Sequence, residues 1–477
     1  MAATFLWHDY ETTGSDPARD RPAQFAAIRT TPELEAVGEP LSFFCKPAPD
    51  VLPQPEACLV TGITPQRMAR EGLIEAEFAA RVHEAMAQPG TCSAGYNSLR
   101  FDDEFTRRLL YRNFYEPYER EWKDGNSRWD LIDLARLCHA LRPAGIQWPL
   151  REDGTASFRL EHLAAANGIA QAHAHEALSD VEATIGLARL IRDRQPRLWE
   201  WFLGLRRKQR VFDLLDVVRQ VPVLHVSSRY PASRGCLAMV VPLARHPQQP
   251  NGVIVYDLDA DPAPLLELDA AEIADRVFVA RADLPEGIER IPLKVIHANR
   301  VPALAPLSTL AGVDLARIAL DHDRALRHAA RLHGVAGLVE KVQAVFARTG
   351  ERDPGGDPEL GLYDGFLPDP DKRLLREVRG TPPDQLGRRP FAFCDGRCSE
   401  LLFRYRARNW PQTLDAAEQA RWDAFRRRRL ETRTPLTGLT LDDYFATIAR
   451  LRADPSTLPA QVPLLDALES WGRDLPP

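Results

Sequence analysis

An apolar strand that ends in two acidic residues constrains the fold of this chain more than any other feature of its sequence. The apolar run TFLW at residues 4–7 is followed directly by HDYETTG, which contains Asp9 and Glu11. Alternate residues of an extended strand point to the same side, so the two carboxylates project together from the strand's carboxyl end. Two anions this close repel each other unless a cation lies between them, and carboxylate oxygens suit Mg²⁺ or Mn²⁺. An exposed strand end with two solvated acids is the competing interpretation of this motif alone.

Two further acidic residues occur in similar local settings. In GYNSLRFDDEF (residues 95–105), a strand of small residues precedes Asp102, which stands at the opening of a helix. Asp102 can act as a helix-start acid, or it can direct its carboxylate toward a site beside the preceding strand. In HAHEALSDVEAT (residues 173–184), His175 precedes Asp180 by five residues at the start of another helix. This separation lets the helix contribute Asp180 while the preceding segment brings an imidazole over the same site.

The length of the chain predicts more than one domain, because 477 residues exceed what a single hydrophobic core usually holds. Residues 1 to about 195 alternate strand-like and helix-like stretches, which predicts a mixed α/β domain. Residues 196–347 contain short strands and turn signals and end in helices, so we expect a β-rich domain there. A segment rich in Gly, Pro and charge follows residue 347, and the chain beyond it is mainly helical up to residue 477.

The composition limits the class of protein. Hydrophobic residues at 44% and charged residues at 27% are typical of a globular protein, and no apolar run approaches the ~20 residues of a membrane span. Seven scattered cysteines fit a reducing compartment, so we expect a cytoplasmic protein without membrane association. The net charge of −6 means that any polyanion has to be held by a local basic groove.

The acids follow one another in the order D, E, D, D, with a histidine five residues before the last. In this pattern the chain resembles the DEDDh 3′–5′ exonuclease superfamily, whose marks DxETTG, FD after a strand, and HxAxxD all occur in register. Longer segments, from LPQPEACLVTGITPQ to LLFRYRARNWPQTLDAAEQARW, are similar to the bacterial exonuclease I family over almost the full length. The resemblance implies an RNase H-like mixed-sheet nuclease domain (residues 1–195), an SH3-like β-rich domain (196–347) and an α-helical C-terminal domain (348–477).

The resemblance also implies the chemistry of the site. Two Mg²⁺ ions, for which Mn²⁺ can substitute, would bridge the scissile phosphate. Asp9 would bridge both ions, and Glu11, Asp102 and Asp180 would complete their ligands. His175 would accept the proton of the attacking water, because an unperturbed imidazole pKa of about 6.5 suits a general base. A surface or helix-capping histidine is the competing interpretation.

Substrate binding requires cations and flat rings. Residues 102–122 interleave arginines with tyrosine and tryptophan, which can track phosphates and stack on bases. In FRYRARNW (residues 403–410) arginines again alternate with aromatic residues, and both a DNA contact and a solvated face remain open. The arginines of residues 426–429 are expected on the solvated surface. The resemblance points to five DNA contacts, namely Arg107, Tyr118, Trp122, Arg136 and Arg159.

The predicted function is a 3′–5′ exonuclease that degrades single-stranded DNA to 5′-mononucleotides in DNA repair and recombination. An RNA-trimming nuclease is the alternative, because the four acids do not distinguish ribose from deoxyribose. A catalytically inactive nucleic-acid-binding module would lack one of the acids, and none is missing. The resemblance also implies contact with the acidic C-terminal tail of single-stranded DNA-binding protein. We expect a monomer whose later domains enclose the DNA strand, so that truncation before Arg348 spares the active site.

Overall fold

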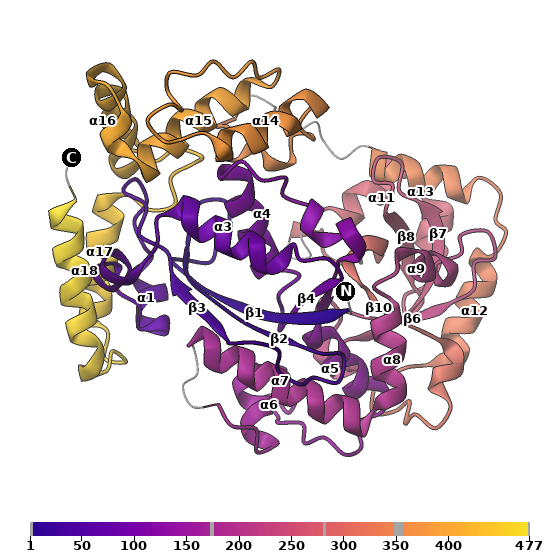
Figure 1. Cartoon of the computed structure of the whole chain (residues 1–477). Coiled ribbons are helices and arrows are strands. Elements are labelled where there is room, and N and C mark those ends of the chain that lie inside the picture. Colours follow the sequence, from indigo (N-terminus) through magenta and orange to yellow (C-terminus); the bar gives the residue numbers. More distant parts are fainter. Residues whose placement is uncertain (1–2, 172–175, 280–282, 348–355, 476–477) are drawn as a thin grey trace. The chain divides into compact units, whose positions relative to one another are not determined.

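The strand predicted near the start of the chain lies at the centre of a five-stranded mixed sheet. The computed structural model describes residues 3–171, 176–279, 283–347 and 356–475, and Figure 1 labels most of its helices and strands. The strand order is β3-β2-β1-β4-β5. Strand β1 pairs antiparallel with β2 and parallel with β4, which makes the sheet mixed. The strands are β1 (Thr4–Thr12), β2 (Pro22–Thr30), β3 (Leu41–Phe44), β4 (Thr91–Gly95) and β5 (Ser127–Asp130).

The chain divides into two compact units that are not continuous in sequence. Unit 1 comprises Met1–Ser127, Gln171–Glu182 and Arg352–Pro477, and unit 2 comprises Arg128–Ala170 and Ala183–Glu351. Compactness therefore groups the C-terminal region with the first part of the chain. The sequence predicts three consecutive domains, and the boundaries of those domains stay a prediction.

Several helices of unit 1 begin at side chains that satisfy the first free amide groups. Asp415 and Glu418 form a capping box at the start of α16, in which each side chain accepts the main-chain N–H of the other. Thr440 likewise accepts the N–H of Asp443 at the start of α17. The helices are α1 (Pro55–Thr61), α2 (Pro65–Glu71), α3 (Glu75–Met86), α4 (Asp102–Arg112), α14 (Asp369–Gly380), α15 (Gly396–Asn409), α16 (Ala416–Glu431), α17 (Leu441–Ala453) and α18 (Val462–Asp474), while α7 (Ala177–Arg194) has residues in both units.

The two faces of β1 serve different purposes. Leu6 and Tyr10 belong to a buried hydrophobic cluster with side chains of α3 and α4, and these helices lie over the sheet in Figure 1. Because successive strand residues point to opposite faces, Asp9 and Glu11 leave the strand on the other side. Burial of the apolar face thus fixes the direction in which the two acids project.

Unit 2 contains a second five-stranded sheet, in which every pairing is antiparallel, with the order β10-β6-β7-β8-β9. Its strands are β6 (Val223–Val226), β7 (Leu237–Arg245), β8 (Gly252–Asp257), β9 (Leu293–His297) and β10 (Ala303–Pro306). Its helices are α5 (Leu131–Leu141), α6 (Leu160–Ala166), α8 (Pro196–Gly204), α9 (Lys208–Leu214), α10 (Ala263–Glu267), α11 (Ala270–Val277), α12 (His322–Leu332) and α13 (Leu338–Ala347). The predicted fold class, a mixed α/β sheet followed by β-rich and helical regions, is confirmed. Among the described helices, none is long and apolar enough to span a membrane.

A cluster of buried charges links distant segments of unit 1. Asp50, whose side chain is fully buried, accepts hydrogen bonds from Arg408 at 2.9 and 2.7 Å and from Arg429 at 2.6 Å. Glu359, also buried, accepts from Arg21 at 2.8 Å and from Arg404 at 3.0 Å. Each carboxylate therefore binds more than one guanidinium, which compensates for the loss of water around these charges.

Burial of the arginines rules out one open alternative and corrects one expectation. Arg404 and Arg406 are 4% and 5% exposed and are occupied by carboxylates, so FRYRARNW is not a solvated face. The surface prediction for residues 426–429 is wrong for Arg426 and Arg429, which are 7% and 5% exposed. Positions three apart share one side of a helix, and this side of α16 faces the interior.

Candidate metal centre

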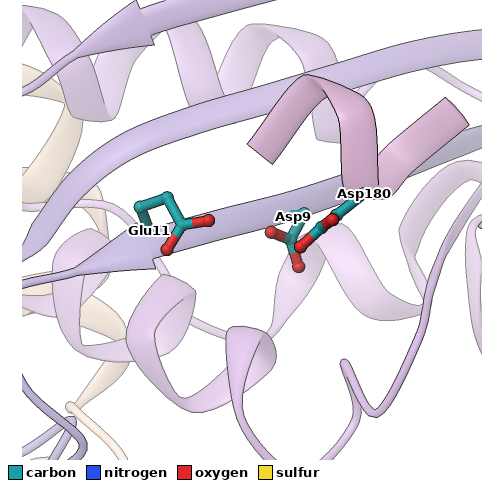
Figure 2. A group of neighbouring side chains, drawn as sticks. All are labelled: Asp9, Glu11 and Asp180. Atoms are coloured by element: carbon teal, nitrogen blue, oxygen red, sulfur yellow. The ribbon is translucent and has the colours of Figure 1, made fainter. Parts of the chain in front are cut away.

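Three acidic side chains meet at the carboxyl end of β1. Asp9 and Glu11 project from the strand, and Asp180 reaches them from the first turn of α7. Each of the three offers a carboxylate oxygen, and these oxygens lie within 4.8 Å of one another. Figure 2 shows the carboxylates of Asp9 and Asp180 side by side, with Glu11 farther along the strand. The cluster presents hard oxygen donors to one small volume, which is the donor set that Mg²⁺ and Mn²⁺ prefer.

Asp102 lies beside this cluster, at the first position of α4. Its side chain is buried, and its Oδ1 accepts a hydrogen bond from the Tyr10 main-chain N–H at 3.0 Å. The bond attaches the start of α4 to the strand between Asp9 and Glu11. The structure thus brings Asp102 close to the acids of β1, although the group of oxygens within 4.8 Å comprises Asp9, Glu11 and Asp180 among the described residues.

The proximity of these acids shifts their protonation. Burial, together with the charges of Asp102, Glu11 and Asp180, raises the pKa of Asp9 well above its usual range. Burial raises the pKa of Glu11 to about 8, and the charges of Asp180 and Asp102 contribute. Both shifts have the same physical cause, because water has been removed from carboxylates that also repel one another. A divalent cation would relieve this repulsion, so the electrostatics of the site fit a metal ion.

One contact of Asp180 was not anticipated from the sequence. The Gln171 side-chain amide donates from Nε2 to Asp180 Oδ1 at 2.6 Å, and both residues belong to unit 1. Such a bond restricts the orientation of a carboxylate that is to hold a metal. Nothing in the local sequence marks Gln171, because it lies nine residues from its partner in an irregular segment. The predicted general base, His175, lies outside the described residues.

A hollow of about 780 Å³ opens beside Glu11. Its wall includes Phe101 and Gly14 from the first part of the chain and Thr437 and Gly438 from the C-terminal region, all within unit 1. A Cβ atom at Gly14 would collide with the Asp20 carboxylate, so the turn after the acidic strand requires glycine at this position. The hollow has room for a nucleotide-sized group next to the metal-binding oxygens.

The wall from the C-terminal region is held in place by Arg19. Its Nε donates to the main-chain oxygen of Pro435 at 2.8 Å. Gly438 lies against the same arginine, since a Cβ at Gly438 would stand 3.3 Å from Arg19 Cβ. The C-terminal region therefore contributes directly to the surroundings of the acids, a role that the sequence did not reveal.

The predicted DNA contacts in unit 1 occupy different environments. Arg107 is buried and donates to Glu121 at 2.7 Å and to Glu104 at 2.6 Å. Its guanidinium lies 5.6 Å from the ring centre of Tyr118, so the structure brings these two predicted contacts together. Trp122 is 65% exposed and presents a free aromatic surface. Arg107 would have to release part of its hydrogen bonding to these carboxylates before its guanidinium could bind a phosphate.

The other two predicted DNA contacts lie in unit 2. Arg136 donates to Asp133 at 2.8 Å and lies 5.6 Å from the ring centre of Phe158. The side chain of Arg159, at the start of α6, is 69% exposed, and its nearest carboxylate is that of Glu161 at 3.6 Å. All five DNA contacts stay predictions.

Comparison with protein-family models gives three matches in sequence order. Residues 6–188 match the model described as Exonuclease, residues 206–348 match the Exonuclease I SH3-like domain, and residues 356–475 match the Exonuclease I C-terminal domain. These segments together span nearly the whole chain, and the first of them contains the acids of the candidate metal centre, Asp9, Glu11, Asp102 and Asp180.

Individual proteins agree with the family models. The chain is 48% identical to exodeoxyribonuclease I of Escherichia coli strain K12 over 425 residues, which cover 89% of each chain. It is 51% identical to the solved exonuclease I of Methylocaldum szegediense, with a TM-score of 0.95 and coverage of 99% of this chain and 100% of that one. It is 45% identical to a zinc-bound E. coli exonuclease I in complex with single-stranded DNA, with a TM-score of 0.93 and complete coverage of both chains.

Proposed function

The chain belongs to the exonuclease I family, and from this premise we propose that it digests single-stranded DNA from the 3′ end and releases 5′-mononucleotides. Because it belongs to this family, the chain is a nuclease, an enzyme that hydrolyses phosphodiester bonds. The observation that carries the proposal is the meeting of Asp9, Glu11 and Asp180 within 4.8 Å at the end of β1. The single-stranded DNA bound to a relative of the same fold supports the choice of substrate.

The acids would hold the divalent metal ions, which we propose to be two Mg²⁺ ions with Mn²⁺ as a substitute. When bound, such ions stabilise the charge that develops on the phosphate and make a metal-bound water more acidic. Asp9, Glu11, Asp102 and Asp180 are the proposed ligands. The solved relative that contains zinc supports a divalent ion in this family.

The remaining residues of the site would position the acids and the substrate. Gln171 orients the Asp180 carboxylate through its amide, and the Tyr10 main-chain N–H orients Asp102. The hollow beside Glu11 would receive the terminal nucleotide. We keep His175 as the proposed general base, which would contribute about 10²- to 10⁴-fold to the rate.

The alternatives and the cellular context follow from the same observations. An RNA-trimming activity has less support, because the similar proteins of Escherichia coli and Haemophilus influenzae are exodeoxyribonucleases. The presence of all four acids, Asp9, Glu11, Asp102 and Asp180, argues against a catalytically inactive nucleic-acid-binding module. A role in DNA repair, a monomeric state and contact with the tail of single-stranded DNA-binding protein are proposed from family membership. The cytoplasm is proposed because all seven cysteines are free thiols.

The proposed function can be tested with one set of substrates. Single-stranded DNA, double-stranded DNA and single-stranded RNA, each labelled at the 5′ or the 3′ end, would be incubated with the protein and Mg²⁺. We expect immediate release of labelled mononucleotide from 3′-labelled single-stranded DNA and a ladder of shortened products from the 5′-labelled strand. Preferential digestion of RNA, or release of the 5′ label first, would contradict the proposal.

A further inference from the structure

A second hollow in unit 1 is surrounded by basic side chains. It has a volume of about 290 Å³ and lies between the end of α3, the segment that follows α4, and α14. None of the acids of the candidate metal centre lines it. The lining acids are Glu116, Glu119 and Asp124, and the lining cations are Arg120, Lys123, Lys372, Arg376 and Arg379. Cations therefore outnumber acids around this small space.

The surrounding ion pairs leave part of this positive charge uncompensated. Lys123 pairs with Glu119 at 2.9 Å, but both side chains are at least 40% exposed, and such pairs are weak. Arg379 donates to main-chain carbonyl oxygens, among them that of Phe114, and a carbonyl carries no net charge. Arg376 is exposed and forms no ion pair with any acid in the described part of the chain.

Arg120 provides an independent indication of a ligand. Its side chain is fully buried, and its Nη2 donates to Asp103 Oδ1 at 2.6 Å. The other two guanidinium nitrogens, Nε and Nη1, are also buried but have no hydrogen-bond partner within the residues that the structure describes. Buried donors normally have a partner, and charged donors most of all, so this guanidinium is incomplete as it stands.

The cations around the hollow also affect the pKa of a neighbouring histidine. Burial lowers the pKa of His83 to about 4, and the charges of Arg379, Arg120 and Lys123 contribute to the shift. The imidazole is therefore neutral at neutral pH. Its ring and the guanidinium of Arg379 lie 4.4 and 3.9 Å from the ring centre of Tyr115, so this aromatic ring already has two close partners.

We propose that this basic hollow binds the phosphate group of a small free molecule, either inorganic phosphate or a nucleoside monophosphate. Guanidinium groups match the geometry of phosphate oxygens, and Arg376 and Arg379 line the hollow together with Arg120, whose buried Nε and Nη1 lack a partner among the described residues. The volume of about 290 Å³ is just below the range for drug-sized ligand pockets, roughly 300 to 1,000 Å³, so the hollow suits a small group. The neighbours of Tyr115 reduce the surface available for stacking a base, so the phosphate is the group recognised.

Calorimetric titration of the full-length protein tests this inference without any measurement of cleavage. The protein would be kept metal-free with a chelator, so that phosphate cannot bind through metal ions at the acids. Inorganic phosphate and dAMP would be titrated separately. We expect saturable binding of at least one of them and competition between the two if both bind. Absence of saturable binding of either ligand would overturn the proposal.

A matched pair of variants locates the binding. Arg376 lines the hollow, whereas Arg373 is exposed on the same helix and does not line it. We expect Arg376→Ala to weaken phosphate binding about tenfold or more, as is typical for the loss of a charge-assisted hydrogen bond, and Arg373→Ala to leave it unchanged. Equal effects of the two variants would mean nonspecific attraction and would overturn the proposal.

Two further measurements test whether the buried Arg120 guanidinium takes part in binding and whether the hollow belongs to the DNA path. Arg120→Lys retains a positive charge for Asp103 but removes the planar donors, so we expect loss of phosphate binding in a variant whose fold is verified by circular dichroism. Unchanged affinity in that variant would exclude the role of Arg120. A single-stranded oligonucleotide that displaces phosphate competitively would assign the hollow to the DNA path and contradict a site for a free molecule.

Discussion

Asp50 accepts two hydrogen bonds from Arg408, at 2.9 and 2.7 Å, although 358 residues separate the two in the sequence. The Asp50 side chain is fully buried, so its charge depends on this partner and on Arg429. The pair therefore ties the segment before α1 to helices of the C-terminal region. It joins the first part of the chain to the C-terminal segment within one compact unit.

Replacement of Asp50 should destabilise the protein strongly. Asp50→Asn would leave the buried guanidinium groups of Arg408 and Arg429 with Glu359 as their remaining carboxylate in the cluster, and breaking a buried ion pair in this way costs about 3–5 kcal/mol. Urea denaturation of the variant and the wild type measures the difference in the free energy of unfolding. Asp369→Asn is the control, because Asp369 is 82% exposed and its pair with Lys372 should contribute about 0–1 kcal/mol. Similar effects of both substitutions would contradict the importance of the buried cluster.

Truncation before Arg348 should prevent unit 1 from folding. The sequence led us to expect that this truncation spares the active site, but the removed region supplies the partners of Asp50 and of Arg21. It also supplies Thr437 and Gly438 of the hollow beside Glu11. We expect the truncated chain to show no cooperative thermal unfolding and no digestion of DNA. A cooperatively folding, active fragment would show that unit 1 tolerates the loss of this region.

Acid should weaken the buried charge cluster. The guanidinium groups around them hold the pKa of Asp50 and of Glu359 below the ordinary values of 3.8 and 4.5, despite burial, which acts in the opposite direction. The unfolded state therefore takes up protons at a higher pH than the native state, so this part of the stability is present above about pH 4.5 and is lost as the pH falls further. Urea denaturation at pH 7, 5, 4 and 3 would show the decline. It should be smaller in Asp50→Asn, and parallel declines in both proteins would exclude Asp50 as a contributor.

Asp180→Asn should abolish digestion while preserving the fold. It removes a proposed metal ligand and one of the charges that raise the pKa of Asp9, so the metal-free variant should be at least as stable as the wild type. We expect a loss in turnover of about a thousandfold or more, which corresponds to several kcal/mol of transition-state stabilisation. Digestion of 3′-labelled single-stranded DNA and thermal unfolding with a chelator provide the two measurements. Asp193→Asn, on the same helix with 67% exposure, is the control and should retain activity.

Gln171→Ala should weaken metal binding without removing a ligand. The lost hydrogen bond to Asp180 leaves the carboxylate less well oriented, and substitutions of this kind typically cost about 10- to 100-fold in metal affinity or activity. Initial rates across a range of Mg²⁺ concentrations should show a higher requirement, with rates recovering as Mg²⁺ is raised. A reduced rate that no Mg²⁺ concentration restores would instead point to a direct contact with the substrate.

The sequence predicts those parts of the structure that depend on local pattern. The apolar run at residues 4–7 correctly predicts a strand, which extends over Thr4–Thr12 as β1, and the alternation of that strand correctly places Asp9 and Glu11 on one side. Helix periodicity could also have separated the buried Arg426 and Arg429, which lie three residues apart on one side of α16, from the exposed residues 427 and 428 between them. These features require only the chemistry of neighbouring residues.

Other parts of the structure depend on contacts between segments that lie far apart in the sequence. No local sequence pattern predicts such contacts. Arg21 and Glu359 are 338 residues apart, and the sequence around neither residue indicates that it forms a buried ion pair. Gln171 reaches Asp180 from an irregular segment, so neither periodicity nor a motif identifies it. The same holds for the unsatisfied donors of Arg120, since burial of a guanidinium is visible only after the fold is known.

The wall formed by Thr437 and Gly438 also has a consequence for the order in which the protein is made. Translation proceeds from the N-terminus, so the strand that carries Asp9 and Glu11 leaves the ribosome long before the segment that completes the hollow beside Glu11. A nascent chain therefore carries the acids early but lacks one side of the nucleotide-sized space until Gly438 has emerged and Arg19 has bound Pro435. Biosynthesis itself delays the assembly of the site, because the acids and the wall that completes the hollow lie far apart in the sequence.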